Sequence, residues 1–335
     1  MESVRRPHAR NLVPWAKDKP EVLVLSADLT SSCEADDFRA AYPDRFFSLG
    51  MAEQNMMGFA AGLAREGFCP FVHTFAVFIS RRPYDQVAMS IAYPNLPVRL
   101  LGFLPGITTP GGVTHQAVDD VALMRAIPNM TILECGDATD VETILDAAHG
   151  VKGPVYLRML RGEMPRLFDK NEPMKVGVPR VLGEGEDVLI LSSGICTEEA
   201  MRAARALKDR GVSAAHMHIT TLKPFDGASW IEAARRTRYG VITFENHSII
   251  GGLGSAAAEV MAEAGLGRKL IRIGLRDKYA HGASRQYLMK TFGLDAMALV
   301  RAVENLCGKS LNIREDELGA IDIVPVHSSA KAEAL

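Results

Sequence analysis

The sequence has 335 residues, a length that suits roughly two domains of common size. Hydrophobic residues account for 47% and charged residues for 23%, and the formal net charge is −2. This balance is ordinary for a soluble enzyme and has no polyelectrolyte signature, so we expect no nucleic-acid partner. The start lacks the apolar stretch of a signal peptide, and no run approaches the ~20 apolar residues that cross a bilayer. We therefore expect a cytoplasmic protein without a membrane partner.

The cysteines are widely scattered and show no paired spacing: Cys33, Cys69, Cys135, Cys196 and Cys307. This pattern predicts neither a disulfide framework nor a zinc site. We expect the thiols to behave as small buried hydrophobic side chains.

The first half of the chain alternates short apolar runs, typical of buried parallel strands, with segments of helical periodicity. We predict strands at 21–27, 45–49, 70–73, 96–103, 130–134 and 155–159. We predict helices at 52–65, 77–91, 118–125 and 138–149. A long loop rich in glycine and proline spans 104–116, and loops of this length inside a domain are usually functional. The alternation predicts one α/β domain over residues 1–165.

A second alternating series follows a stretch at 166–186 that is rich in Pro, Gly and charge and suits a linker. Its predicted strands are 188–191, 212–219, 240–244 and 269–273, and its predicted helices are 197–207, 228–235 and 253–264. We expect a smaller α/β domain over 187–310 and assign no structure to the tail at 311–335. The predicted fold is two doubly wound α/β domains with mainly parallel sheets.

Four sets of residues are candidates for chemistry: Glu53, Phe75 with Phe78, His115, and Arg158 with Arg161. Each has an ordinary structural explanation, since acids favour the first turn of a helix and spaced aromatics are usually core residues. A lone loop histidine is usually a surface residue. The two arginines near a strand end predict an anion clamp, although a solvated basic pair is commoner.

Order and spacing give these residues more weight, because together they resemble the transketolase family over about residues 5–307. The pyrimidine-binding domain of that family is resembled at 26–30 (SADLT), 50–54 (GMAEQ), 74–78 (TFAVF), 114–116 (THQ) and 123–129 (LMRAIPN). Its C-terminal domain is resembled at 245–247 (ENH) and 251–254 (GGLG). The resemblance implies a thiamine-diphosphate-enzyme type of fold.

The Gly-Asp-Gly motif with which this family holds the diphosphate and a divalent metal does not occur in the sequence. The resemblance therefore implies the C-terminal half of a split transketolase. A partner chain, the N-terminal half, would hold Mg²⁺ or another divalent ion and the diphosphate of thiamine diphosphate. The implied assembly has two copies of each chain and transfers a two-carbon glycolaldehyde unit from a ketose phosphate to an aldose phosphate.

The resemblance also assigns roles to individual residues. Glu53 matches the glutamate that hydrogen-bonds N1′ of the cofactor's aminopyrimidine and favours its imino tautomer. Phe75 and Phe78 match the aromatics that pack against this ring, and Asp28 matches an acid near the cofactor. His115 matches a histidine near the C1 hydroxyl and carbonyl of the ketose.

The family's contacts to the sugar phosphate fall on Arg5, Ser32 and Arg161. Bidentate arginine contacts suit a phosphate well.

Three positions depart from the family pattern. Arg81 replaces a usual aromatic, Gly111 an acid that reads an acceptor hydroxyl, and Phe103 a histidine near the phosphate. Because losing such contacts changes which hydroxyl pattern is preferred, a non-standard ketose such as apulose 4-phosphate is an alternative substrate.

Three other interpretations remain open. The chain is also similar in length and domain plan to the β-subunit of a 2-oxo acid dehydrogenase E1 component, which lacks the Thr-Phe-x-x-Phe pattern. The 1-deoxyxylulose 5-phosphate synthase branch has a similar Ala-Glu-Gln motif but is normally one full-length chain. A non-catalytic homologue that acts as a scaffold is the third alternative.

Overall fold

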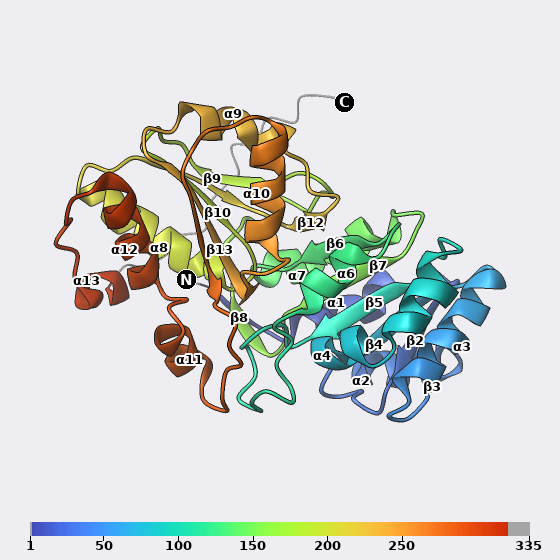
Figure 1. Cartoon of the computed structure of the whole chain (residues 1–335). Helices are drawn as coiled ribbons and strands as arrows, with labels where there is room; N and C mark the ends of the chain where they lie inside the picture. The colour runs from blue at the N-terminus through green and yellow to red at the C-terminus, as the bar shows by residue number, and fades with distance from the viewer. Residues whose placement is uncertain (1, 321–335) are drawn as a thin grey trace.

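The computed structural model describes residues 2–320, which form two lobes around two separate sheets (Figure 1). The first sheet has seven strands in the order β12-β6-β7-β5-β4-β2-β3. Its six parallel strands are β2 (Val22–Ser26), β3 (Phe46–Ser48), β4 (Cys69–Phe75), β5 (Arg99–Phe103), β6 (Thr131–Glu134) and β7 (Val155–Met159). The seventh, β12 (Thr221–Lys223), comes from the second half of the chain and runs antiparallel to β6.

Helices cover both faces of this sheet. They are α1 (Pro7–Trp15), α2 (Asp36–Ala41), η1 (Pro43–Arg45), α3 (Glu53–Arg65), α4 (Ala76–Arg81), α5 (Tyr84–Gln86), η2 (Val87–Ala92), α6 (Asp120–Ala126) and α7 (Ala138–His149). Successive side chains of a strand point to opposite faces, so Val22 and Val24 join one hydrophobic cluster and Leu23 and Leu25 the other. Such continuous apolar runs are what a parallel sheet covered on both faces requires.

The second lobe contains five strands in the order β14-β13-β10-β11-β9. These are β9 (Arg180–Gly183), β10 (Val188–Ser192), β11 (Ala214–His218), β13 (Gly240–Ser248) and β14 (Leu270–Leu275), of which only β9 is antiparallel to its neighbour. Its helices are α8 (Cys196–Asp209), α9 (Ala228–Arg236), α10 (Leu253–Glu263), α11 (Arg285–Thr291), α12 (Ala296–Cys307) and α13 (Glu315–Gly319). The predicted α/β class with mainly parallel sheets is confirmed.

The structure differs from the sequence prediction in the single helix predicted at 77–91. That segment is interrupted at Arg82 and Pro83, which separate α4 from α5, and α5 passes directly into the π-helical η2 at Val87. Proline has no N–H to donate and its ring clashes with the preceding turn, so it kinks or breaks a helix, and here the α-helix is broken at Pro83.

Other elements lie where none was predicted. β1 (Ser3–Arg5) pairs antiparallel with β8 (Glu163–Pro165), and β9 lies inside the stretch predicted as the 166–186 linker. The predicted unassigned tail at 311–335 contains α13, and its residues 321–335 lie outside the described residues.

Two further expectations can be compared with the structure. Four of the five cysteines are buried thiols and Cys307 is half-buried. No helix within residues 2–320 is both long enough and apolar enough to cross a membrane.

Candidate active site

The site is built at one edge of the first sheet. Because β2, β3, β4, β5 and β7 are parallel, their carboxyl ends meet at the same edge, where open α/β sheets bind ligands. All but one of the predicted site residues lie at the ends of these strands or in the segments that follow them: Asp28, Ser32, Glu53, Phe75, Phe78, His115 and Arg161. Arg5, the exception, lies at the end of β1.

Glu53 is the first residue of α3, and its side chain is only 4% exposed. Its Oε1 accepts a hydrogen bond of 2.7 Å from Nη1 of Arg82, whose side chain is 48% exposed. The Arg82 guanidinium also lies 4.0 Å from the centre of the Phe78 ring. The Arg82 guanidinium, a planar group that donates hydrogen bonds, therefore binds the Glu53 carboxylate and lies over the Phe78 ring. No local sequence pattern identifies Arg82 as a site residue, because it pairs with a residue 29 positions away.

Phe75, Phe78 and His115 form one group of rings. The two phenylalanine rings stack with centroids 5.8 Å apart and planes 25° apart. The His115 ring meets both edge-on, at 6.1 Å from Phe75 and 5.5 Å from Phe78. Phe75, the last residue of β4, and Phe78, in α4, therefore lie side by side next to the long loop.

Arg161 links this ring group to a cavity. Its guanidinium lies 5.8 Å from the Phe75 ring centre, and its Nη1 donates to the backbone oxygen of Ser32 at 2.8 Å. A cavity of about 430 Å³ is lined by Arg5, Arg6, Ser31, Glu34, Leu104, Thr108, Pro110, Arg161, Gly162 and Glu163. Three of these residues are arginines and two are glutamates, and Arg6 already pairs with Asp36, so Arg5 and Arg161 are the guanidinium groups that could bind an anion.

Two predicted site residues are placed less favourably. Asp28 is exposed and has a left-handed backbone with φ of 60°. Ser32 contributes its backbone oxygen to Arg161, and its neighbour Ser31 lines the cavity instead. The structure therefore gives neither side chain a defined contact within the ring group or the cavity.

The three departures from the family pattern have clear surroundings. Arg81 forms a bidentate ion pair with Asp119, with its shortest contact at 2.7 Å. Gly111 lies against His115, since a Cβ at this glycine would come within 3.1 Å of the histidine Cβ. No side chain therefore stands between Gly111 and His115.

Phe103 is fully buried between His8 and His73, with ring centroids 5.4 Å and 5.9 Å away. The two histidines share a 3.0 Å contact between their Nε2 atoms. Burial lowers the pKa of His73 to about 4 and that of His8 well below its usual value, so both rings are neutral at pH 7.

The predicted anion clamp is wrong for Arg158. Its side chain is completely buried and pairs with Asp120 at 2.8 Å and with Glu134. Burial alone would raise the pKa of Asp120, but the neighbouring charges, Arg158 foremost, outweigh it and hold that pKa below its usual value. The guanidinium is therefore already neutralised inside the protein and is unavailable to a substrate.

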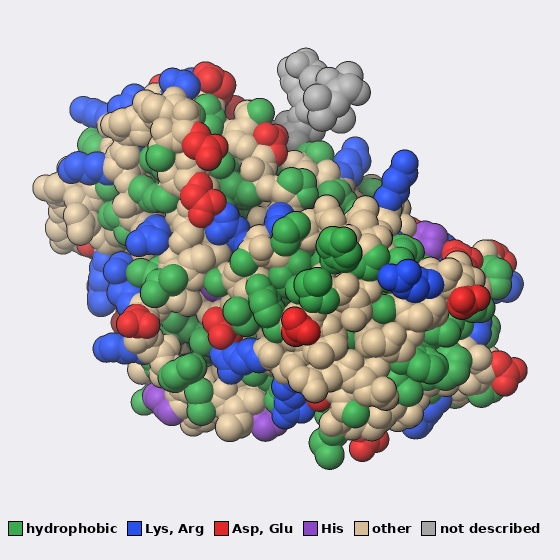
Figure 2. Space-filling model, turned by 45° about the vertical axis from the view of Figure 1, so that its right-hand side comes forward, with side chains coloured by type: hydrophobic (Ala, Val, Ile, Leu, Met, Phe, Trp, Pro, Cys, Tyr) green, Lys and Arg blue, Asp and Glu red, His purple; other side chains and the backbone are tan. Residues whose placement is uncertain are grey.

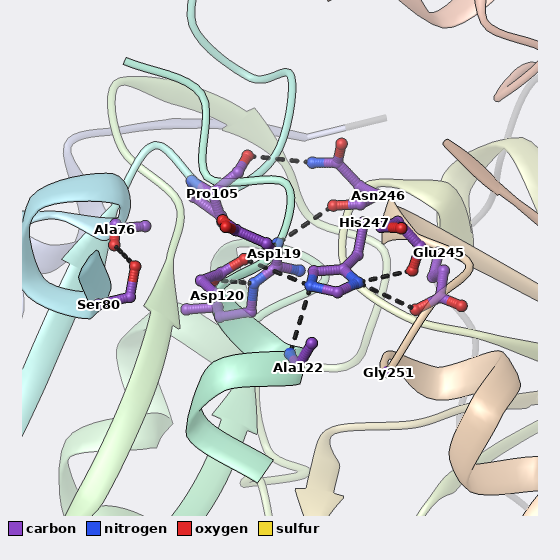
Figure 3. Close-up of polar contacts among 12 residues, drawn as sticks. Ala76, Ser80, Pro105, Asp119, Asp120, Ala122, Glu245, Asn246, His247 and Gly251 are labelled. Atoms are coloured by element: carbon purple, nitrogen blue, oxygen red, sulfur yellow. Dashed lines mark hydrogen bonds and ion pairs between the residues drawn. The ribbon is translucent and has the colours of Figure 1, made fainter. Parts of the chain in front are cut away.

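The Glu245–His247 segment lies at the end of β13, where the second lobe meets the first (Figure 3). Asn246 contacts the loop that leads to His115, and His247 Nε2 accepts from the backbone N–H of Ala122 at 3.4 Å. Glu245 accepts from the backbone N–H groups of Leu253 and Gly254 at the start of α10. Burial raises the pKa of Glu245 to about 8.

Family models match most of the chain. The transketolase pyrimidine-binding domain matches residues 4–166, and the transketolase C-terminal domain matches residues 177–299. The chain belongs to the transketolase family. The resemblance drawn from the sequence motifs is thereby confirmed.

Similar proteins include separate half-length members of this family. The putative transketolase C-terminal section of Methanocaldococcus jannaschii is 37% identical, with 90% of this chain and 95% of that protein covered. The 6-deoxy-6-sulfo-D-fructose transketolase subunit SqwH of Clostridium sp. (strain MSTE9) is 40% identical, with coverages of 88% and 91%. A solved structure described as a split gene transketolase, inactive beta4 tetramer, is 39% identical with a TM-score of 0.83, and the coverages are 90% and 97%. The chain is thus a split transketolase-family subunit.

Transketolases depend on thiamine diphosphate, and the residues present fit the aminopyrimidine part of that cofactor. Glu53 offers a buried carboxylate as hydrogen-bond acceptor, and the ring group offers aromatic faces, which together suit a flat ring that carries N–H donors. Arg82 makes the same two kinds of contact in this structure. Residues 2–320 contain no group of three or more His, Cys, Asp or Glu side chains arranged to hold a metal ion.

Proposed function

We propose that this chain is the pyrimidine-binding half of a thiamine diphosphate-dependent transketolase. It would transfer a glycolaldehyde unit from a ketose phosphate to an aldose phosphate, together with a partner chain that holds the diphosphate and Mg²⁺. The observation that supports this most strongly is the buried Glu53 carboxylate next to the stacked Phe75 and Phe78 rings. Catalytic roles for Glu53 and His115 are part of this proposal.

When bound, the cofactor would supply a carbon nucleophile and an electron sink, and the protein would supply orientation and electrostatics. Glu53 would hold a proton at the ring nitrogen N1′, and its low exposure keeps water from competing for that hydrogen bond. Phe75 and Phe78 would fix the plane of the ring. His115 lies edge-on to both rings, from where it would hydrogen-bond the C1 hydroxyl of the ketose.

The arginine-lined cavity is the proposed site for the phosphate of the sugar. Arg5 and Arg161 both line it, and Arg161 also reaches the Phe75 ring. Its held guanidinium loses little conformational freedom on binding an anion, because the backbone oxygen of Ser32 already orients it. Asp28 is proposed, with less support from the structure, as an acid near the cofactor.

A partner is part of the proposal because Glu53 must meet a cofactor whose diphosphate is held elsewhere. Four apolar side chains on or beside α3 and η2 are exposed, a group we call the α3–η2 surface: Met51 (77%), Phe59 (39%), Met89 (57%) and Tyr93 (78%). Figure 2 shows that apolar side chains also gather near the middle of one face of the molecule. Because the α3–η2 surface adjoins Glu53, we assign it to the partner chain, in an assembly with two copies of each chain.

A second candidate is the same reaction on a non-standard ketose. Gly111 leaves the side of His115 without an acidic side chain, and Phe103 is buried away from the cavity. Both changes remove polar contacts that would select a hydroxyl pattern. Apulose 4-phosphate is one such substrate, and the relative named for 6-deoxy-6-sulfo-D-fructose makes sugar sulfonates another class to compare. A clear preference for xylulose 5-phosphate in kcat/KM would reject this candidate.

The test of the catalytic assignment is Glu53→Gln in the reconstituted complex. Glutamine keeps the size of the side chain but cannot hold the N1′ proton as a carboxylate does, so we expect kcat to fall by roughly 10²–10⁴-fold. Glu66→Gln is the matched control, since Glu66 is an exposed acid at the other end of α3. Unchanged turnover of Glu53→Gln would remove the catalytic role and favour the scaffold interpretation.

A further inference from the structure

The second lobe supplies none of the residues proposed to touch cofactor or substrate, yet it reaches the loop that carries His115. Asn246, near the end of β13, is 1% exposed and contacts the start of the 104–116 loop. We propose that Asn246 is a positioning residue that holds this loop in the shape that presents His115. The catalytic part of this inference rests on the function proposed above.

Both ends of the Asn246 amide are used on the loop backbone. Its Oδ1 accepts from the N–H of Ile107 at 3.0 Å, and its Nδ2 donates to the oxygen of Pro105 at 3.1 Å (Figure 3). Gly106, between these two residues, has a left-handed φ of 59°, and a Cβ there would lie 2.2 Å from Oδ1 of Asn246. The Asn246 amide therefore supplies the hydrogen-bond partners of two backbone groups in this turn, and the glycine between them leaves room for the amide.

Asn246 is itself held in place by contacts with the first lobe. Its backbone oxygen accepts from Nη2 of Arg158 at 3.1 Å, and Arg158 is fixed by the buried carboxylates of Asp120 and Glu134. The next residue, His247, accepts from the backbone of Ala122 in α6. Asn246 is thus anchored to the ion-pair network between the lobes. This role explains why Arg158 is buried there instead of binding an anion.

The 104–116 loop connects Asn246 to both parts of the proposed site, the arginine-lined cavity and the ring group. Three of its residues, Leu104, Thr108 and Pro110, line the arginine cavity, and His115 near its other end meets the ring group. Next to His115, Gln116 donates to the backbone oxygen of His281 at 3.3 Å, a second tie to the second lobe. A loop released at Asn246 would therefore disturb both the cavity and His115.

The test uses Asn246→Ala and Asn246→Asp in the full chain. Hydrogen–deuterium exchange on the chain alone should show the Ile107 amide exchanging about tenfold faster in Asn246→Ala, since it loses its acceptor. In the reconstituted complex we expect kcat to fall about tenfold to a hundredfold and KM for the phosphorylated substrate to rise, with thiamine diphosphate affinity unchanged. Asn246→Asp keeps the acceptor for Ile107 and should partly restore its protection.

Lys223→Met is the matched control, because the Lys223 ammonium ties β12, a segment from the second half of the chain, to the backbone oxygens of Arg125 and Ile127 without touching the loop. It should lower the free energy of unfolding while leaving Ile107 exchange unchanged. If the Ile107 amide exchanges in Asn246→Ala at the same rate as in the wild type, the proposal that Asn246 holds the loop is wrong. Faster exchange with unchanged kcat and KM would overturn its role in catalysis. A wild-type complex without transfer activity would reject the proposed function and the catalytic part of this inference, whereas the exchange data would still decide whether Asn246 braces the loop.

Discussion

Glu245 is a buried carboxylate whose protonation is linked to stability. Burial raises its pKa from the ordinary 4.5 to about 8, although two backbone N–H groups of α10 favour the charged form and limit the effect. The folded state therefore binds a proton more tightly than the unfolded state between these values. Its contribution to stability is complete below the unfolded pKa and is lost as pH rises through the folded one.

We predict that Glu245→Gln flattens the decline of the free energy of unfolding with rising pH. The window to measure is roughly pH 7.5–8, because histidines of the unfolded chain, whose pKa is about 6.5, are mostly neutral there, as are the buried His73 and His247 of the folded state. Urea unfolding at several pH values measures the slope of the free energy of unfolding against pH. The slope is compared instead of the absolute stability, because glutamine has one acceptor oxygen fewer than glutamate and so changes the absolute stability by itself. Glu259→Gln, an exposed acid on α10, is the control. Parallel slopes for Glu245→Gln and wild type would refute the assignment.

At the level of residues, the site was easiest to predict from the sequence where one short motif contains all the residues that contact one another. Phe75 and Phe78 are three apart at a helix start, so local geometry alone puts their rings together. Arg82 and Arg158 show the limit, because their partners come from segments far away in the sequence. A basic residue near a strand end looks the same in sequence whether it faces a cavity or a buried carboxylate.

At the level of elements, the α3–η2 surface gives the next prediction. Tyr93→Ser and Met89→Asp should each weaken association with the partner chain about tenfold or more, because they remove large apolar contacts or place a charge in the interface. Isothermal titration or analytical ultracentrifugation of the two purified chains measures this affinity.

Ile250→Asp is the control for these variants, since Ile250 is also an exposed apolar residue, at 59%, but lies in the second lobe. Wild-type affinity for both surface variants would show that the partner docks elsewhere. Loss of self-association with unchanged partner affinity would instead assign the surface to a second copy of this chain.

Most elements of the sheets could be predicted because buried parallel strands are continuous apolar runs. β12 and β9 could not, since edge strands of three and four residues carry too little pattern. The break at Pro83 was readable in principle, because a proline inside a helical pattern kinks or breaks the helix. β12 also shows a feature that no local pattern reveals: a segment of the second half completes the sheet of the first.

At the level of the whole molecule, the two lobes form a unit joined by β12 and by the buried network around Arg158. The unit presents a carboxylate, a ring group and an arginine-lined cavity at one sheet edge. These parts suit the pyrimidine and sugar ends of a thiamine reaction. We therefore propose that this chain is one half of a catalyst.

The most direct test is a glycolaldehyde-transfer assay with thiamine diphosphate and Mg²⁺, run on this chain alone and again with its co-expressed candidate partner. We predict glycolaldehyde transfer only in the mixture of the two chains. Transfer by this chain alone would contradict the split-enzyme proposal, and silence in the mixture across xylulose 5-phosphate, apulose 4-phosphate and a sugar sulfonate would contradict the proposed reaction.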